Sequence, residues 1–218
     1  MRDAVKALTD AAVPFQGPSA AVLERCYDKF EAHRVASAAG IDCPDTTLGS
    51  DAGAAAFPVM LKPRHGSDSI GVRLWMQGEL PQRVRSERFI VQRYVRGAEL
   101  TVAVLRDRVG MPLHIVLPEG TPYSFWRKYL WCPVRMPVGD NSVAERVRQV
   151  ALGIAMIFGV DWAARIDLIH ETATDRLRFL ECDAAPLVGA RSAFAASFKA
   201  AGIDRAEQLQ MLVNEIPE

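Results

Sequence analysis

The sequence predicts an α+β fold, in which antiparallel strands packed with helices build two lobes. Strand patterns follow one another between residues 57 and 119, with short polar or glycine-bearing turns between them. Amphipathic helical patterns flank these strands at 19–40 and 142–158. The chain has 218 residues, which is enough for one large core or for two smaller lobes that share a cleft.

Helical patterns begin the chain. Residues 3–12 place apolar side chains on one face, and Pro14 ends this segment. A second apolar stripe runs from 19 to 40, which predicts one long helix that stops at Gly40. Residues 41–48 are expected to form a short connection that carries one edge strand.

Strand patterns dominate the middle of the chain. Residues 57–63 and 72–76 enclose a glycine-bearing loop, an order typical of a hairpin with a flexible tip. Further strands are expected at 88–95, 99–107 and 111–119, the first two joined at Gly97. Strands in such close succession predict an antiparallel sheet packed on helices.

The second half of the chain has a long helix and a strand pair. Residues 142–158 form an amphipathic pattern, with Ser142 as the cap in a capping box. Two strands at 162–170 and 176–184 are joined by a polar turn. A final helix is expected near 205–213.

Composition excludes several classes of protein. The 26 Lys and Arg residues balance 26 Asp and Glu residues, so there is no general attraction to nucleic acid or to an anionic membrane. The amino terminus lacks the apolar core of a signal peptide, which predicts a cytoplasmic protein. The four cysteines lie far apart, and their spacing indicates neither a zinc site nor a disulfide framework.

Three carboxylates mark the late strand pair. Glu181 and Asp183 are two residues apart and therefore point to the same face of a strand, and the partner strand can bring Asp167 beside them. Converging carboxylates repel one another unless a cation lies between them, and Mg²⁺ prefers oxygen ligands together with nucleotide phosphates. Three separately solvated strand residues are the alternative interpretation.

A lysine followed by a glycine-bearing loop is the second feature. Lys62 ends the apolar strand 57–63, and the loop after it carries Gly66 and Gly71. This order suits a lid over phosphates, although most glycine-bearing loops are plain turns. Together with the downstream carboxylates, it favours a site for a triphosphate with Mg²⁺.

These features occur in an order that resembles a known family. The segments are DKFEAHRVASAAGI, FPVMLKPRHGSDSIGV, FIVQRYVRGAELTVAVL, WAARIDLI and FLECDAAP. Their order is similar to the ATP-grasp superfamily and, more narrowly, to the central and C-terminal domains of D-alanine–D-alanine ligases. The resemblance implies a remnant of an otherwise absent N-terminal domain at 1–18, a central subdomain at 19–96 and a C-terminal subdomain at 97–218, with a nucleotide held between the lobes.

The resemblance also implies a role for each residue that matches a family motif. The implied nucleotide contacts are Lys29, Lys62, the adenine linker Gln92, Arg93, Tyr94 and Val95, and Glu99 at the ribose. The implied ligands of Mg²⁺, or of Mn²⁺, are Asp167, Glu181 and Asp183. The residues implied in catalysis are Arg165 at the reacting oxyanion, Lys128 and Ser69, and those implied at the second substrate are Ser192 and Leu187.

The sequence departs from the family pattern at several of these positions. Gln92 replaces an acidic residue, Asp183 replaces an asparagine, and Leu187 replaces a glycine. Asp68 and Ser69 stand where the family usually has two serines. The nucleotide and metal side is therefore retained, whereas the side that would hold the second substrate is altered.

The resemblance implies an ATP- and magnesium-dependent ligase that joins a carboxylate to an amine through an acyl phosphate. The expected substrates are amino acids or other small carboxylates, and a second copy or a partner chain is expected to complete the site. One alternative is a catalytically impaired nucleotide-binding module that needs a partner. Another is a ligase for non-alanine amino acids in specialised metabolism. Three of these residues also fit plain structural roles. Lys29 would lie on a polar helix face, Glu99 would begin a strand, and Lys128 would belong to a solvated basic pair.

Overall fold

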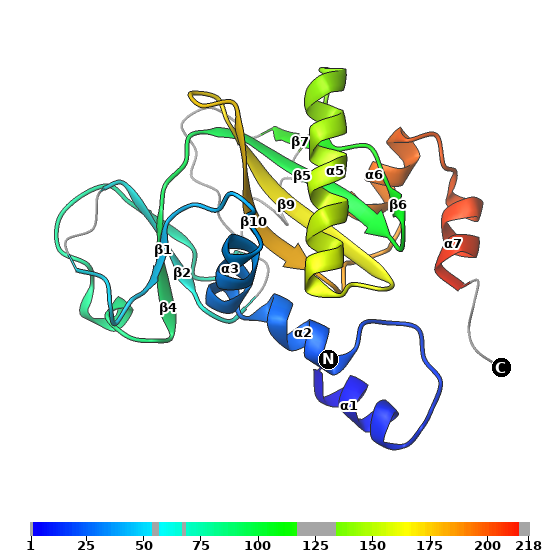
Figure 1. Cartoon of the computed structure of the whole chain (residues 1–218), viewed down its shortest axis with the longest axis horizontal. Helices are drawn as coiled ribbons and strands as arrows, with labels where there is room; N and C mark the ends of the chain where they lie inside the picture. Colours follow the sequence, from blue (N-terminus) through cyan, green and yellow to red (C-terminus); the bar gives the residue numbers. More distant parts are fainter. Residues whose placement is uncertain (1, 54–56, 67–68, 117–133, 214–218) are drawn as a thin grey trace.

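The computed structural model describes residues 2–53, 57–66, 69–116 and 134–213. Within these ranges the strands form two antiparallel sheets, one of four strands and one of six. Figure 1 shows the smaller sheet at one side of the molecule and the larger sheet crossed by a long helix. The predicted α+β class with two lobes is confirmed.

The small lobe is built from the first strands of the chain. They are β1 (Thr46–Leu48), β2 (Val59–Pro63), β3 (Arg73–Trp75) and β4 (Phe89–Arg93), in the order β1-β4-β2-β3. The predicted hairpin is confirmed, since β2 pairs with β3. A short 3-10 helix, η1 (Gln82–Val84), supplies Val84 to a small apolar core with Val59, Leu61 and Val91.

The large lobe contains the remaining strands. They are β5 (Gly97–Leu105), β6 (Arg108–Val109), β7 (Leu113–Val116), β8 (Val134–Pro137), β9 (Ala163–Glu171) and β10 (Arg176–Asp183). The order is β10-β9-β5-β7-β8, and β6 pairs with β5. The expectation of a single sheet for the strands between 57 and 119 is wrong, because β5 leaves the small sheet and pairs along its whole length with β9.

Helices cover both faces of the large sheet (Figure 1). On one face, α5 (Asn141–Phe158), α2 (Ala20–Tyr27) and α3 (Lys29–Ala38) share a core with the strands. On the other face, α6 (Ala193–Ala200) and α7 (Arg205–Val213) pack on the far end of β5 and β9. The first helix, α1 (Arg2–Asp10), contacts α2. No helix in the described ranges is both long enough and apolar enough to cross a bilayer.

Two helix starts differ from the sequence prediction. The predicted helix 19–40 is broken at Asp28, whose backbone is extended and whose carboxylate accepts the N–H groups of Phe30 and Glu31 at the start of α3. Asp140, and not Ser142, caps α5, because its Oδ1 accepts the N–H of Ser142 at 2.8 Å. In both cases an aspartate carboxylate accepts N–H groups of the first helical turn, which have no partner within the helix.

Candidate active site

A cleft opens between the two sheets. It is partly open to solvent and is lined by side chains from both lobes. Its walls come from α3, β2 and the loop after β2 on one side, and from β5, β7, β9 and β10 on the other. The charged and hydroxyl side chains that line it are Lys29, Lys62, Ser69, Glu99, Asp167 and Glu181.

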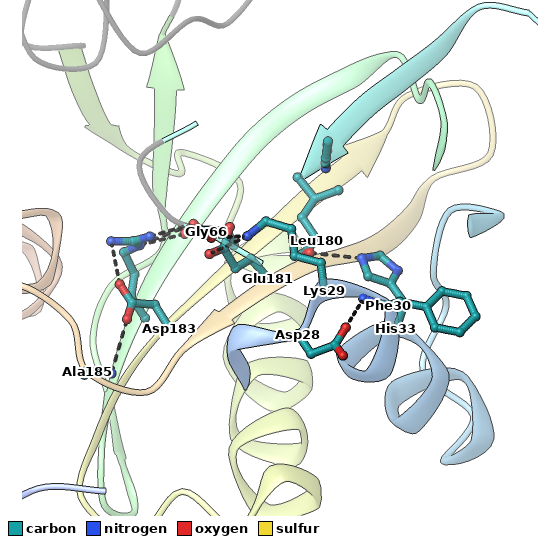
Figure 2. Close-up of polar contacts among 12 residues, drawn as sticks. Asp28, Lys29, Phe30, His33, Gly66, Leu180, Glu181, Asp183 and Ala185 are labelled. Carbon is teal, nitrogen blue, oxygen red and sulfur yellow. Dashed lines mark hydrogen bonds and ion pairs between the residues drawn. The ribbon is translucent and has the colours of Figure 1, made fainter. Parts of the chain in front are cut away.

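Lys29 enters the cleft from the first turn of α3. Its side chain is 10% exposed, and its Nζ lies 3.8 Å from Glu181 Oε1. The same amine donates to the carbonyl oxygen of Gly66 in the loop after β2, as Figure 2 shows. Asp28 fixes this arrangement from behind, because it caps α3 and also binds Arg64 at the start of the loop, with Arg64 Nη2 2.7 Å from Asp28 Oδ2.

Lys62 enters the cleft from β2. Its Nζ donates to Gln92 Oε1 at 2.7 Å. Burial lowers the pKa of Lys62 to about 8, against the opposing effect of the nearby carboxylates Glu181, Glu99 and Asp167. The amine is therefore still charged near neutral pH and is poorly solvated, which favours the binding of an anion.

A bulge in β10 brings Glu181 to the cleft and places Asp183 on the same face of the sheet. Phe179 pairs with Leu168, but Glu181 pairs with Asp167, so Leu180 is an extra residue in the ladder. If Leu180 were paired with Asp167 in a regular ladder, Glu181 would stand opposite Ile166, which lies in the core. The bulge therefore turns Glu181 and Asp183 to the face that carries Asp167.

Arg165 lies among these carboxylates. Its Nε donates to Asp167 Oδ1 at 3.0 Å, and its Nη1 lies 3.2 Å from Asp183 Oδ2. Burial by itself lowers the pKa of Arg165, but Asp167 and Asp183 outweigh burial and raise it. Burial also raises the pKa of Asp183, and Arg165 opposes this change. Thr101 on β5 completes the cluster by donating to Asp167 Oδ1 at 2.7 Å.

Residues 42–214 match the protein-family model described as D-ala D-ala ligase C-terminus. The chain belongs to this family. The matched segment contains β2, β5, β9 and β10, and with them every cleft residue named above except Lys29.

Two curated relatives carry the name D-alanine–D-alanine ligase. The chain is 30% identical over 156 residues to D-alanine–D-alanine ligase B of Xanthomonas campestris pv. campestris, covering 68% of this chain and 49% of that protein. It is 27% identical over 218 residues to the D-alanine–D-alanine ligase of Bordetella avium, covering 89% of this chain and 67% of that protein. The chain thus spans about half of the length of the first relative and about two thirds of the length of the second.

Solved structures of ligases in this family have the same fold. The D-alanine–D-alanine ligase of Bacillus anthracis complexed with ATP superposes with a TM-score of 0.80 at 18% identity, covering 96% of this chain and 72% of that one. A D-Ala:D-Ser ligase of Enterococcus faecalis gives a TM-score of 0.79 at 19% identity, with 96% and 67% covered. The fold is therefore the ATP-grasp fold predicted from the sequence.

The structure brings part of the predicted site together. Lys29, Lys62 and Glu99 line one cleft with Ser69, whose φ of 58° is unusual for a residue other than glycine. Lys128 lies outside the described residues. The roles implied for these residues by the family stay predictions.

Other predicted residues lie away from the cleft lining. Ser192 Oγ accepts the N–H of Ala195 at 3.1 Å and so caps α6, and Leu187 is 70% exposed. The guanidinium of Arg93 binds Asp45 and Glu171. In the implied adenine linker, the N–H groups of Arg93 and Tyr94 already donate to the carbonyl oxygens of Asp45 and Pro58, and Val95 is buried.

Several residues that support the site are not among those predicted from the sequence. Thr101 is two residues after Glu99 on β5, and this spacing on a strand places both on one face. Asp28 and Arg64 hold the loop after β2, and His33 and Thr46 lie behind Lys62. The Asp28-x-x-Glu31 spacing is typical of a helix start and could have indicated the first of these.

The fit to a divalent cation depends on the paired carboxylates. Among the described residues, no group of three or more His, Cys, Asp or Glu side chains is arranged to hold a metal ion. Asp167 and Glu181 are nevertheless cross-strand neighbours that line the cleft. Mg²⁺ is commonly held by one or two carboxylates together with substrate phosphates. The pair therefore fits a cation that binds with a nucleotide, and Asp183 as a third ligand stays a prediction.

Proposed function

We propose that this chain forms the nucleotide-binding and catalytic part of a ligase that uses ATP and Mg²⁺ to join a carboxylate to an amine, releasing ADP and phosphate. The observation that carries the proposal is the convergence, in one cleft between two lobes, of two lysines and three carboxylates that the family pattern assigns to this reaction. These residues are Lys29, Lys62, Glu99, Asp167 and Glu181. Family membership supports the reaction class.

The reaction has two steps. The carboxylate oxygen of the first substrate attacks the γ-phosphorus of ATP, which forms an acyl phosphate and releases ADP. The amine of the second substrate then attacks the acyl carbon, an amide bond forms, and phosphate leaves. The first step needs positioning and charge neutralisation more than covalent help from the protein.

The cleft residues suit these steps. Lys29 and Lys62 would bind phosphate oxygens, and Glu99 would accept hydrogen bonds from the ribose hydroxyls. A divalent cation at Asp167 and Glu181 would supply further neutralisation of phosphate charge. Arg165 would donate to the acyl oxygen while negative charge develops on it, which lowers the barrier of the second step.

Phosphate release tests the proposal directly. The purified chain is incubated with ATP, Mg²⁺ and a panel of D- and L-amino acids, singly and in pairs, and amino-acid-dependent phosphate is measured. Glu181→Gln is expected to abolish metal-dependent turnover while the circular dichroism spectrum stays unchanged, because only one ligand charge is lost. Glu79→Gln, at an exposed position of the small lobe, is the matched control and should retain turnover. Wild-type rates in Glu181→Gln would exclude the proposed cation site.

The same panel separates the alternatives. Binding of ATP without amino-acid-dependent phosphate release would favour a catalytically impaired nucleotide-binding module. Release with a pair other than D-alanine would favour a ligase for other amino acids, consistent with Leu187 at a position where the family pattern has glycine. Light scattering at the assay concentration tests the expected second copy or partner chain. A monomer with full turnover would contradict that expectation.

A further inference from the structure

We propose that the side chain of Gln92 is a positioning residue that holds the amine of Lys62 in the cleft, and that it makes no contact with the nucleobase. The inference rests on the proposed function, because Lys62 is the lysine that would bind the nucleotide. It assigns to Gln92 a role other than the adenine contact implied by the family pattern. Three features of the small lobe lead to it.

The first feature is the register of the small sheet. On β4, Gln92 stands directly opposite Thr46 of β1 and directly opposite Met60 of β2. Lys62 is therefore the diagonal neighbour of Gln92 on the same face of the sheet, within reach of two long side chains. The hydrogen bonds follow this register, since Lys62 Nζ donates to Gln92 Oε1 at 2.7 Å and Gln92 Nε2 donates to Thr46 Oγ1 at 2.9 Å.

The second feature is a chain of hydrogen bonds that fixes the orientation of the amide. The hydroxyl of Thr46 donates to the carbonyl oxygen of Pro44 at 2.8 Å. A hydroxyl has one proton, so Thr46 Oγ1 can only accept from Gln92. The NH₂ group of Gln92 must then face Thr46, and its oxygen must face Lys62. Rotating the amide by half a turn would place its NH₂ group against the ammonium of Lys62.

The third feature is burial behind the cleft wall. Gln92 is 1% exposed and is not among the residues that line the cleft, whereas Lys62 is. His33 of α3 covers Gln92, with its Nε2 3.2 Å from Gln92 Nε2. Burial lowers the pKa of His33 to about 4, so the ring is neutral, and it contacts the carbonyl oxygen of Leu180 at 3.0 Å (Figure 2). The amide is therefore buried behind the part of the cleft wall that Lys62 lines.

Anchoring matters because a lysine is a flexible point charge. Its four-carbon stem has many rotamers, and an acceptor held in place reduces the number that the amine samples. The other charged groups near Lys62 are Glu181, Glu99, Asp167 and Lys29, all of which face the space that a triphosphate would occupy. Among the acceptors that the structure describes around Lys62, Gln92 Oε1 binds the amine from the side away from this space.

A double-mutant cycle tests the inference. Affinity for a non-hydrolysable ATP analogue with Mg²⁺ is measured by calorimetry on the full chain, in the wild type, Gln92→Leu, Lys62→Met and the double variant. Gln92→Leu should bind about tenfold more weakly, the size expected for a lost hydrogen bond to a charged group. The same substitution should have no further effect once Lys62 is Met. Gln82→Leu, an exposed glutamine of the same lobe, is the control and should bind like the wild type.

The outcomes separate the two proposals. A wild type that does not bind the analogue overturns the proposed function and this inference together. A wild type that binds, with equal binding by Gln92→Leu, overturns the inference alone. An equal loss from Gln92→Leu in both backgrounds also overturns it, because Gln92 would then contact the nucleotide without Lys62.

A second pair of variants covers the case in which Gln92→Leu does not fold. Gln92→Glu keeps an acceptor next to Lys62, so the analogue should bind at least as tightly as to the wild type. In the Lys62→Met background the new carboxylate would be buried without its partner, and thermal unfolding should occur at a clearly lower temperature. Equal effects of Gln92→Glu on unfolding in both backgrounds would contradict the inference.

Discussion

Replacing Glu171 by Gln should weaken the contact between the two lobes. Glu171 ends β9, and its side chain is 10% exposed. Its carboxylate accepts from Thr174 at 2.7 Å and from Arg178 at 2.8 Å, and it lies 3.4 Å from Arg93 at the end of β4 in the small lobe. The hydrogen bond from Thr174, followed by that from Arg178, lowers the pKa of Glu171 from 4.5 to about 2.

The pKa difference gives the size of the effect. The fall of the pKa from 4.5 to about 2, at about 1.4 kcal/mol for each pKa unit, corresponds to at most about 3.5 kcal/mol of folding free energy. The carboxylate lies close to the molecular surface, so solvent screening reduces the expected loss to about 2 kcal/mol. For a chain of this length, such a loss lowers Tm by about 4–8 °C.

Urea unfolding at several pH values is the assay. Because the folded pKa lies below the unfolded one, the contribution of Glu171 is complete above about pH 5 and is lost as the pH falls towards 2. The stability difference between the wild type and Glu171→Gln should therefore shrink between pH 5 and pH 3. Glu207→Gln removes an exposed ion pair, with Arg108 Nη1 3.9 Å from Glu207 Oε1, and should cost less than about 1 kcal/mol. A difference that stays constant with pH, or equal effects of both variants, would refute the reasoning.

Two further predictions concern the cleft and the join between the lobes. Nucleotide affinity should fall about tenfold between pH 7 and pH 9, because the pKa of Lys62 is about 8 and its amine loses its charge across this range. Calorimetry at both pH values measures this affinity. An unchanged affinity would exclude Lys62 as a phosphate contact. Gly97→Ala should lower Tm by several degrees, because a Cβ at Gly97 would overlap the backbone of His170 on β9. Gly139→Ala, where a Cβ meets nothing within 4 Å, is its control in thermal unfolding, and equal Tm values for the two variants would contradict the clash.

The sequence predicted the parts of the site that follow from strand periodicity. Glu181 and Asp183 share a face because residues two apart on a strand always do, and the short polar turn before β10 places Asp167 opposite. Periodicity could not say which face this would be. The bulge at Leu180 decides that, and it depends on how β10 pairs with β9 and packs under α3.

The errors have a common physical origin in contacts between distant segments. The short spacing of the strands from 57 to 119 predicts one sheet, yet β5 pairs along its whole length with β9, which is remote in sequence. Asp28 breaks the first long helix because its carboxylate caps α3 and also binds Arg64, which is remote in sequence. Local propensity carries no information on any of these pairings.

The charges in the cleft relate the site geometry to the proposed chemistry. Among the described charged side chains that line the cleft, the acidic residues Glu99, Asp167 and Glu181 outnumber the lysines Lys29 and Lys62 by one. A bare triphosphate would therefore enter a site with no surplus of positive charge, which is unfavourable where solvent is partly excluded. A nucleotide accompanied by a divalent cation removes this difficulty, because the cation can be shared between the phosphates and the Asp167–Glu181 pair. Arg165, which now lies between Asp167 and Asp183, would then have fewer anions to balance and could donate to a reacting oxygen. In this arrangement, cation binding and catalysis use the same carboxylates.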